Sequence, residues 1–154
     1  MLSFKIEMIS DTQMVYFYGP IDENVSPVLS ELKDRLDFDC PIGFDLSGVL
    51  YVSSLGLRYW VNFARQTQEF RQIEIHKCPA ELINLASVIP HFFGRWSVVS
   101  VLVDLDCSEC SYESQTILTG AEKDESAASD HAVLACEGCG HLVTVDLDLE
   151  LLSS

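Results

Sequence analysis

The segment from Phe44 to Trp60, FDLSGVLYVSSLGLRYW, constrains the fold of this chain more than any other part of the sequence. Its first half carries closely spaced apolar residues, which is typical of a buried strand, and the spacing becomes helical after Ser53 and Ser54. A strand, a tight turn and a helix are therefore expected. The two serines would stand at the helix N-terminus, where unpaired amides and the helix dipole favour a cap or a negatively charged group.

Strands and helices alternate on both sides of this segment. The apolar pattern predicts strands at about 4–8, 15–18, 42–46, 73–75 and 96–103, and helices at about 25–36, 55–70 and 79–89. The resulting order is strand, strand, helix, strand, helix, strand, helix, strand. Such an order is typical of the α/β class, in which crossover helices pack against a mixed β-sheet.

Charge is distributed unevenly along the chain. Residues 104–154 carry 12 acidic side chains and one basic side chain, a net charge of -11, whereas residues 1–103 have a net charge of -4. An acidic surface repels phosphate backbones, so nucleic-acid binding is not expected. The sequence also lacks an apolar run long enough to span a membrane, and its N-terminus lacks the apolar block of a signal peptide. A cytoplasmic protein without direct membrane insertion is expected.

Four cysteines form two CxxC pairs in the acidic region. Cys107 and Cys110 are separated from Cys136 and Cys139 by 25 residues, and strand-like segments flank both pairs. Four thiolates in this pattern are typical of a structural zinc site in a small β zinc ribbon. We therefore predict a zinc-ribbon-like module at 104–154, in which metal binding supplies much of the folding free energy.

Other interpretations of the cysteines exist. A rubredoxin-like iron site would make the protein an electron carrier, although the cysteine loops lack the proline that such proteins show. Two disulfides are disfavoured in a cytoplasmic protein. Four thiolate ligands leave no open coordination position, so the metal is expected to be structural rather than catalytic.

Residues 1–103 resemble the STAS domain, the fold of bacterial anti-sigma factor antagonists. The segment from Asp45 to Val49 matches the strand part of the family motif, and Ser54, Gly56 and Leu57 match the part that opens the following helix. The resemblance implies a STAS-like mixed β-sheet with packed helices. It also implies a non-enzymatic protein–protein interaction or regulatory function, as a component of a partner switch.

The resemblance singles out Ser54 as a candidate phosphoacceptor. In anti-sigma factor antagonists, the serine after the motif aspartate is phosphorylated by a partner kinase that is also the anti-sigma factor, and Ser54 occupies that position. Ser53 stands in place of the aspartate, and Leu55 stands in place of the next Ser or Thr. Either serine could also cap the helix without being modified.

The helix after Ser54 carries a second apolar set, Leu55, Tyr59 and Phe63, beside its expected core stripe. STAS domains bind partners through this helix and the turn before it. The predicted partner-binding patch therefore consists of Ser53, Ser54, Leu55, Arg58, Tyr59 and Asn62. The partner implied is a kinase-like anti-sigma factor. The alternative is that the ribbon folds back over these residues, and the apolar helix surface is also compatible with a homodimer.

Two further functional classes compete with the switch. One is a constitutive STAS scaffold, similar to the STAS subunits of some membrane lipid transporters, which has no phosphorylation cycle. The other is an enzyme. The sequence offers no carboxylate pair, no nucleophile with a base and no phosphate-binding glycine loop at a usable spacing, so catalysis is not expected.

Overall fold

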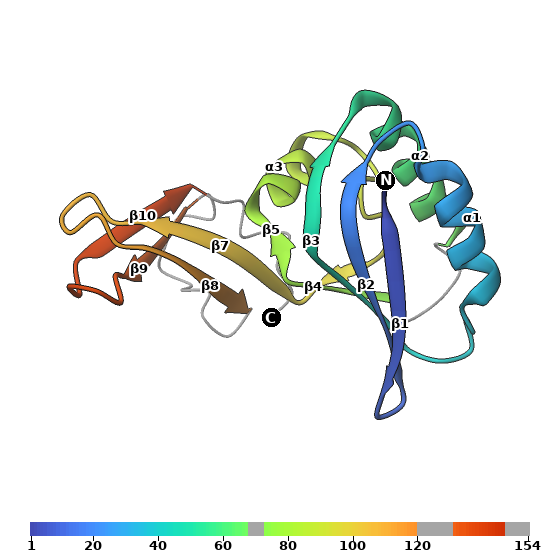
Figure 1. Ribbon diagram of the computed structural model, residues 1–154, viewed down its shortest axis with the longest axis horizontal. Helices are drawn as coiled ribbons and strands as arrows, with labels where there is room; N and C mark the ends of the chain where they lie inside the picture. Colours follow the sequence, from blue (N-terminus) through green and yellow to red (C-terminus); the bar gives the residue numbers. More distant parts are fainter. Residues whose placement is uncertain (68–72, 120–130, 147–154) are drawn as a thin grey trace.

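The computed structural model describes residues 1–67, 73–119 and 131–146, and it confirms the mixed α/β class (Figure 1). The chain begins with two strands, after which strands and helices alternate as the sequence predicts. The elements are β1 (Ser3–Ile9), β2 (Thr12–Ile21), α1 (Val25–Arg35), β3 (Ile42–Val52), α2 (Ser54–Gln66), β4 (Ile73–His76), β5 (Cys78–Pro79), α3 (Ala80–Val88), β6 (Ser97–Val98), β7 (Ser100–Asp106), β8 (Glu113–Thr119), β9 (His131–Ala135) and β10 (Leu142–Asp146).

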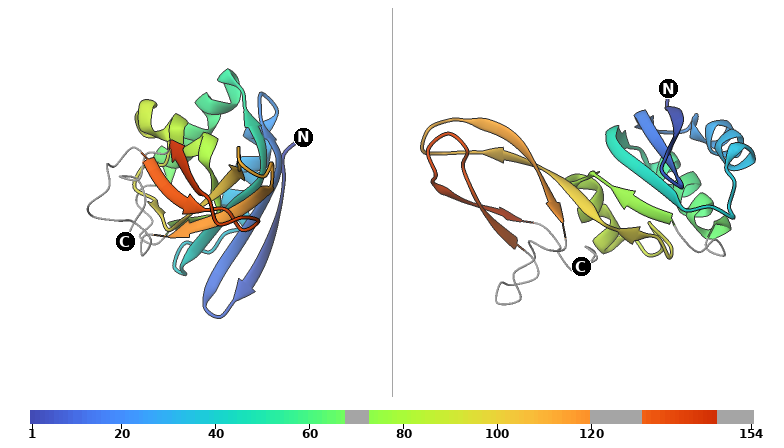
Figure 2. Two further views of the ribbon diagram at one scale, coloured as in Figure 1. Left: turned by 90° about the vertical axis from the view of Figure 1, so that its left-hand side faces the viewer. Right: turned by 90° about the horizontal axis from the view of Figure 1, so that it is seen from below.

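The largest sheet has five strands in the order β1-β2-β3-β4-β6. β1 and β2 form an antiparallel hairpin, and the remaining neighbours in the sheet are parallel. Helices α1 and α2 lie together on one side of this sheet, whereas α3 lies toward the smaller sheets (Figures 1 and 2). Parallel neighbours joined by helices account for this layered arrangement.

Aromatic side chains fill the core between the sheet and α2. The Phe17 ring packs edge-on against Phe44 with centroids 5.3 Å apart, and Trp60 packs edge-on against Trp96 with centroids 5.5 Å apart. The buried Nε1 of Trp96 donates a hydrogen bond to the hydroxyl of Thr67 at 3.1 Å. Because Thr67 also caps the C-terminus of α2, this bond connects the end of the helix to the core.

Helix α2 is shorter than the sequence predicts. The apolar pattern extends the helix to about residue 70, but α2 ends at Gln66 and Thr67 is its C-cap. The Thr67 hydroxyl lies 3.1 Å from the carbonyl oxygen of Phe63, to which it donates. Side-chain hydrogen bonds of this kind offer the backbone an alternative to continuing the helix. Residues 68–70 lie outside the described residues.

The expected strand at 96–103 divides into two strands that belong to different sheets. β6 pairs with β4 at the edge of the five-stranded sheet, whereas β7 pairs with β5 and β8 in a three-stranded sheet. The boundary expected between residues 103 and 104 falls inside β7, which runs without a break from Ser100 to Asp106. The separation of the chain into two domains, 1–103 and 104–154, stays a prediction.

The C-terminal hairpins extend away from the main sheet. β7 and β8 form one antiparallel pair, and β9 and β10 form another. Together they project as an arm from the side of the molecule opposite α1 and α2 (Figures 1 and 2). Within the described parts of the chain, no helix is both long enough and apolar enough to cross a membrane.

Candidate functional site

The four cysteines of the two CxxC pairs come together at the outer end of the arm. Cys107 and Cys110 follow β7, and Cys136 and Cys139 follow β9. All four Sγ atoms lie within 4.8 Å of one another. The Sγ atoms of Cys107 and Cys139 are 3.7 Å apart, and those of Cys110 and Cys136 are 3.6 Å apart. The structure therefore confirms that the four thiols converge on one site.

The sulfur separations fit a tetrahedral metal site. A zinc–sulfur bond of about 2.3 Å places neighbouring sulfurs of a regular tetrahedron about 3.8 Å apart. The observed separations of 3.6 and 3.7 Å agree with this geometry, and all four thiols are free. They are too far apart for a disulfide, in which the sulfurs lie about 2.05 Å from each other. The donor set could hold one metal ion, with zinc and iron both compatible.

Each cysteine pair lies in a turn with the same backbone geometry. The amide of Cys107 donates to the carbonyl oxygen of Tyr112 at 3.1 Å, and the amide of Cys136 donates to that of His141 at 2.8 Å. In both turns the first cysteine is buried and the second is exposed. The two turns are thus structural repeats of each other, and they present their sulfurs to a shared centre.

The residue after each pair adopts a left-handed backbone conformation. Ser111 has φ of 58° and Gly140 has φ of 77°. The amide of Ser111 donates to the carbonyl oxygen of Cys107, and the amide of Gly140 donates to that of Cys136. Glycine adopts this conformation without steric cost, whereas serine is strained in it. This repeat escaped the sequence analysis because Ser111 and Gly140 share no side-chain chemistry.

Backbone amides shift the acidity of the cluster. Hydrogen bonds from the amides of Cys139 and Gly138 lower the pKa of the Cys136 thiol to about 7. At Cys110, a hydrogen bond from the Tyr112 amide acts in the same direction, but hydrogen bonding with the neighbouring thiols outweighs it and raises the pKa to about 12. Donors that point at sulfur stabilise a thiolate, which is the form that binds metal. The Cys136 thiol is therefore more readily ionised than the Cys110 thiol.

The start of α2 is the second predicted site. Ser53 is the N-cap, and its hydroxyl accepts a hydrogen bond from the amide of Gly56 at 3.1 Å. A side chain at Gly56 would overlap the carbonyl group of Ile21, so only glycine lets this turn pack against the end of β2. Ser54 is the first residue of the helix and is exposed. Of the two serines, Ser53 is the one that caps the helix.

The predicted partner-binding patch is only partly apolar at its surface. Leu55 is 47% exposed, and Arg58 and Asn62 are exposed on later turns of α2. Tyr59 is half-buried against the core. The prediction that places Phe63 in a second apolar set outside the core is wrong. Phe63 is only 3% exposed, because its ring packs against Phe44 and Trp96. The described strands of the arm lie at the other end of the molecule from α2 (Figure 1).

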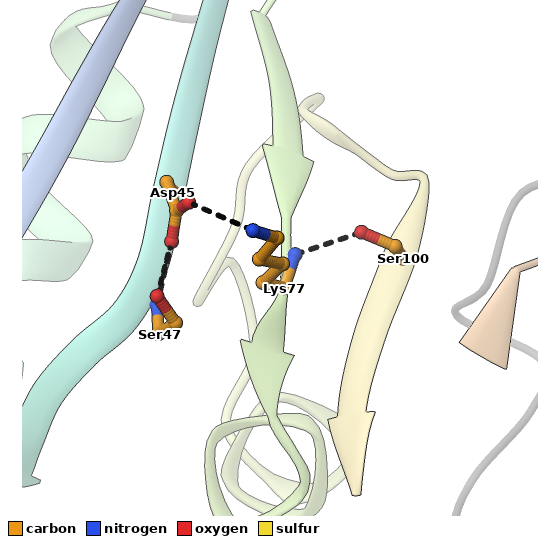
Figure 3. A network of polar contacts seen from close by, with 4 residues as sticks. All are labelled: Asp45, Ser47, Lys77 and Ser100. Carbon is orange, nitrogen blue, oxygen red and sulfur yellow. Dashed lines mark hydrogen bonds and ion pairs between the residues drawn. The ribbon is translucent and has the colours of Figure 1, made fainter. Parts of the chain in front are cut away.

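A polar network stands where the main sheet divides, with Asp45 and Ser100 buried and with Ser47 and Lys77 exposed (Figure 3). The carboxylate of Asp45, which is 6% exposed, accepts hydrogen bonds from the Ser47 amide at 2.9 Å and the Ser47 hydroxyl at 2.6 Å. The Nζ atom of Lys77 lies 4.0 Å from Asp45, and the Lys77 amide donates to the hydroxyl of Ser100 at 2.8 Å. The network connects β3 with the segments around β5 and β7.

Sequence reasoning missed the Lys77 and Ser100 part of this network. Lys77 has φ of 50°, which turns the chain between β4 and β5 and separates their pairing partners. Nothing in the local sequence marks Lys77 for this conformation, since no glycine, asparagine or aspartate stands there. The Asp45-Leu46-Ser47 spacing was the one available signal, because an aspartate commonly accepts a hydrogen bond from the amide two residues later.

Comparisons with known proteins return matches among solved structures. A structure of Mglu is 22% identical with a TM-score of 0.40, and the match covers 46% of this chain and 18% of that chain. An anti-sigma factor antagonist from Mycobacterium paratuberculosis is 19% identical with a TM-score of 0.42, over 58% of this chain and 84% of that one. The anti-sigma factor antagonist SpoIIAA in its unphosphorylated form is 14% identical with a TM-score of 0.38, over 57% and 84%.

The chain thus spans less than a fifth of the length of Mglu, the first of these structures, and 84% of the two antagonists. No protein-family model and no curated protein matches the sequence. The roles proposed below for individual residues therefore rest on the geometry of this chain and on its motif.

Proposed function

We propose that this protein is a non-enzymatic, cytoplasmic regulatory protein that binds a protein partner through the exposed start of α2. The main observation in support of the proposal is that the two serines have different structural roles. Ser53 forms the helix cap, and Ser54 stands exposed beside it on the first turn. The hydroxyl of Ser54 can accept a phosphate without loss of the cap. The match of Asp45, Ser54 and Gly56 to the STAS motif also supports the proposal.

Phosphorylation at this position would act as an electrostatic switch. A phosphoserine carries about -1.5 to -2 charges, and the N-terminus of a helix stabilises such an anion. The neighbouring Leu55 side chain is 47% exposed and would contact a partner through apolar surface. Adding charge beside that contact imposes a desolvation cost on the bound state. The unmodified protein is therefore the form that binds, and the partner would be a kinase-like anti-sigma factor.

Two measurements test the switch. Mass spectrometry of the protein isolated from its native cells should locate phosphate at Ser54. In calorimetric titrations with a purified kinase-like ATPase partner, Ser54→Asp should weaken binding at least tenfold, and Ser54→Ala should leave it unchanged. Ser87→Asp is the matched control, because it adds the same charge to an exposed position on α3.

Equal affinities for the Ser54→Asp and Ser54→Ala variants would contradict the switch. If phosphate is also absent from Ser54 in native cells, the protein is a constitutive scaffold or transporter-associated subunit. Loss of binding in Leu55→Asp would then still assign the partner contact to α2. Binding that survives both Leu55→Asp and Ser54→Asp would remove the α2 patch from the interface.

We further propose that the cysteine cluster holds one structural zinc ion. Cys107, Cys110, Cys136 and Cys139 would be the four ligands, and the ion would hold the two turns of the arm together. Elemental analysis of protein produced without an affinity tag should find one zinc per chain in a colourless sample. A red sample that contains iron would replace this proposal with a rubredoxin-like electron carrier.

A further inference from the structure

A groove follows the half of β3 that has no strand beside it on the β4 side. β4 pairs with Ile42–Asp45 only, and β2 pairs with the other edge of β3 along its length. Within the described ranges, no strand pairs with the β4 side of the segment from Ser47 to Val52. Two adjoining cavities, of about 270 Å³ and about 230 Å³, lie along this segment. The edge of β3 that lacks a partner strand thus borders the groove.

The walls of the groove combine apolar and polar groups. β3 forms one wall. The opposite wall is formed by α3, β5 and β7, with one residue each from β8 and β10. Leu50 stands at the rim and is 70% exposed, so a large apolar side chain faces solvent beside an unpaired strand edge. The apolar lining residues include Val49, Leu50, Val52, Pro79, Leu82 and Leu85. An uncovered apolar surface of this kind is typical of a binding groove.

Among the residues that the structure describes, the charges that line the groove are negative. Glu81 and Asp104 are the charged residues that line its two cavities. The Asp104 carboxylate accepts a hydrogen bond from the side-chain Nε2 of Gln115 at 2.8 Å. This partner is neutral, so the negative charge stays in place. Lys77 and Asp45 line neither cavity. The net charge of -15 for the whole chain adds to this field, so the groove is complementary to a basic ligand.

We propose that this groove binds an extended, basic segment of a partner protein, which adds as a strand to the free edge of β3. The segment from Ser47 to Val52 is about 20 Å long at 3.3 Å per residue, enough for a strand of about six residues. The main chain of the ligand would pair with β3, and alternate apolar side chains would enter the groove. Lysine or arginine side chains between them would face Glu81 and Asp104 at the rim.

This groove is a second binding surface, beyond the patch at the start of α2. None of Ser53, Ser54, Leu55, Arg58, Tyr59 and Asn62 lines either of its cavities. The ligand chemistry also differs, because the groove selects an extended backbone and positive charge. The two surfaces can therefore be tested separately.

The probe is a fluorescent six-residue peptide in which valine and lysine alternate, titrated with the full-length protein and followed by fluorescence anisotropy. Saturable binding is expected, with an affinity that falls as salt screens the rim charges. Leu50→Ala should weaken binding by about fivefold or more, because the side chain is buried only in the complex. The double variant Glu81→Gln, Asp104→Asn should also weaken binding and should reduce its salt dependence.

Two control variants are matched to these changes. Val88→Ala removes an apolar side chain that is 71% exposed on α3 but lines neither cavity, and Asp34→Asn removes an exposed charge on α1. Both should retain the affinity of the unmodified protein. Glutamate in place of lysine in the peptide should abolish binding.

Three results would overturn the proposal. The first is absence of saturable binding, or an equal loss in the groove variants and their controls. The second is binding of the peptide to the full-length double variant Leu149→Ser, Leu151→Ser but not to the unmodified protein. This result would assign the groove to the C-terminal end of this chain. The third is self-association of the full-length protein that Leu50→Ala abolishes, which would assign the groove to a second copy.

Discussion

Gly56 illustrates how a single residue positions the start of α2. Its amide completes the cap made by the Ser53 hydroxyl, and its missing side chain leaves space for the carbonyl group of Ile21. The amide of Ser53 donates to the same carbonyl oxygen at 2.9 Å. The end of β2 and the first turn of α2 are therefore held together, which places Ser54 at the surface.

Replacing Gly56 by alanine should destabilise the protein. Alanine favours a helix by about 1 kcal/mol over glycine, but overpacking against the Ile21 carbonyl should cost about 1–3 kcal/mol. The Gly56→Ala variant should therefore unfold at lower urea concentration than the unmodified protein, whereas Ser54→Ala should be close to neutral. A stabilised Gly56→Ala variant would show that the turn relaxes away from β2.

The two cysteine turns are elements in which backbone conformation is expected to support metal binding. Their amides make equivalent hydrogen bonds, and the residue after each pair has a positive φ. Among the described residues other than its two chain neighbours, no heavy atom lies within 4 Å of the position that a Cβ at Gly140 would occupy. A change at Gly140 therefore alters backbone strain without a steric clash.

The variant Gly140→Ala should bind zinc more weakly than the unmodified protein. A left-handed conformation costs an alanine about 1 kcal/mol or more, which corresponds to about a fivefold loss of affinity. Competition between the full-length protein and a chromogenic zinc chelator measures the effect. The reciprocal change Ser111→Gly relieves strain in the first turn and should not weaken binding. Equal losses in both variants would argue against backbone strain as the cause.

Strand β3 takes part in two different arrangements. Its first half is paired on both sides, and its second half is paired with β2 alone. The turn at Lys77 directs the chain from β4 into β5, which pairs with β7. The groove exists because the sheet divides at this point.

Across the whole molecule, stability is expected to be divided between the main sheet and the arm. The aromatic core around Phe17, Phe44 and Trp60 is fully buried and lies under α2. In the arm, by contrast, the side chains of Val133 and Leu142 are 52% and 64% exposed. Val103, Leu105 and Leu118 are buried where β7 and β8 join the main body, but the exposed side chains of β9 and β10 leave the outer hairpin with less apolar support. Folding of the outer part of the arm should therefore depend on a bound metal ion.

Removing the metal with a chelator should therefore unfold the outer part of the arm and leave the main sheet folded. Hydrogen exchange of the full-length protein would show faster exchange in β8, β9 and β10 after chelation, with slow exchange retained in β2 and β3. A full-length variant with Cys110→Ser and Cys139→Ser should reproduce the chelated pattern. Uniform acceleration through β2 and β3 would contradict this division, and so would an arm that is unaffected by the chelator.

Much of the fold and part of the site could be predicted from the sequence by itself. The alternation of strands and helices, the helix that follows Ser53 and the convergence of four cysteines all depend on local periodicity and short spacings. Such patterns are visible in a single chain because the interacting residues are neighbours along it.

Other features depend on partners that are distant along the chain, and these could not be predicted from local patterns. Phe63 is buried because Phe44 and Trp96 surround it, although its helical position placed it in the second apolar set. Residues 96–103 divide between two sheets because β4 and β5 offer them different partners. The groove beside β3 likewise forms where Lys77 turns the chain. Contacts between residues far apart in the chain determine these features. Periodicity along the sequence does not indicate such contacts.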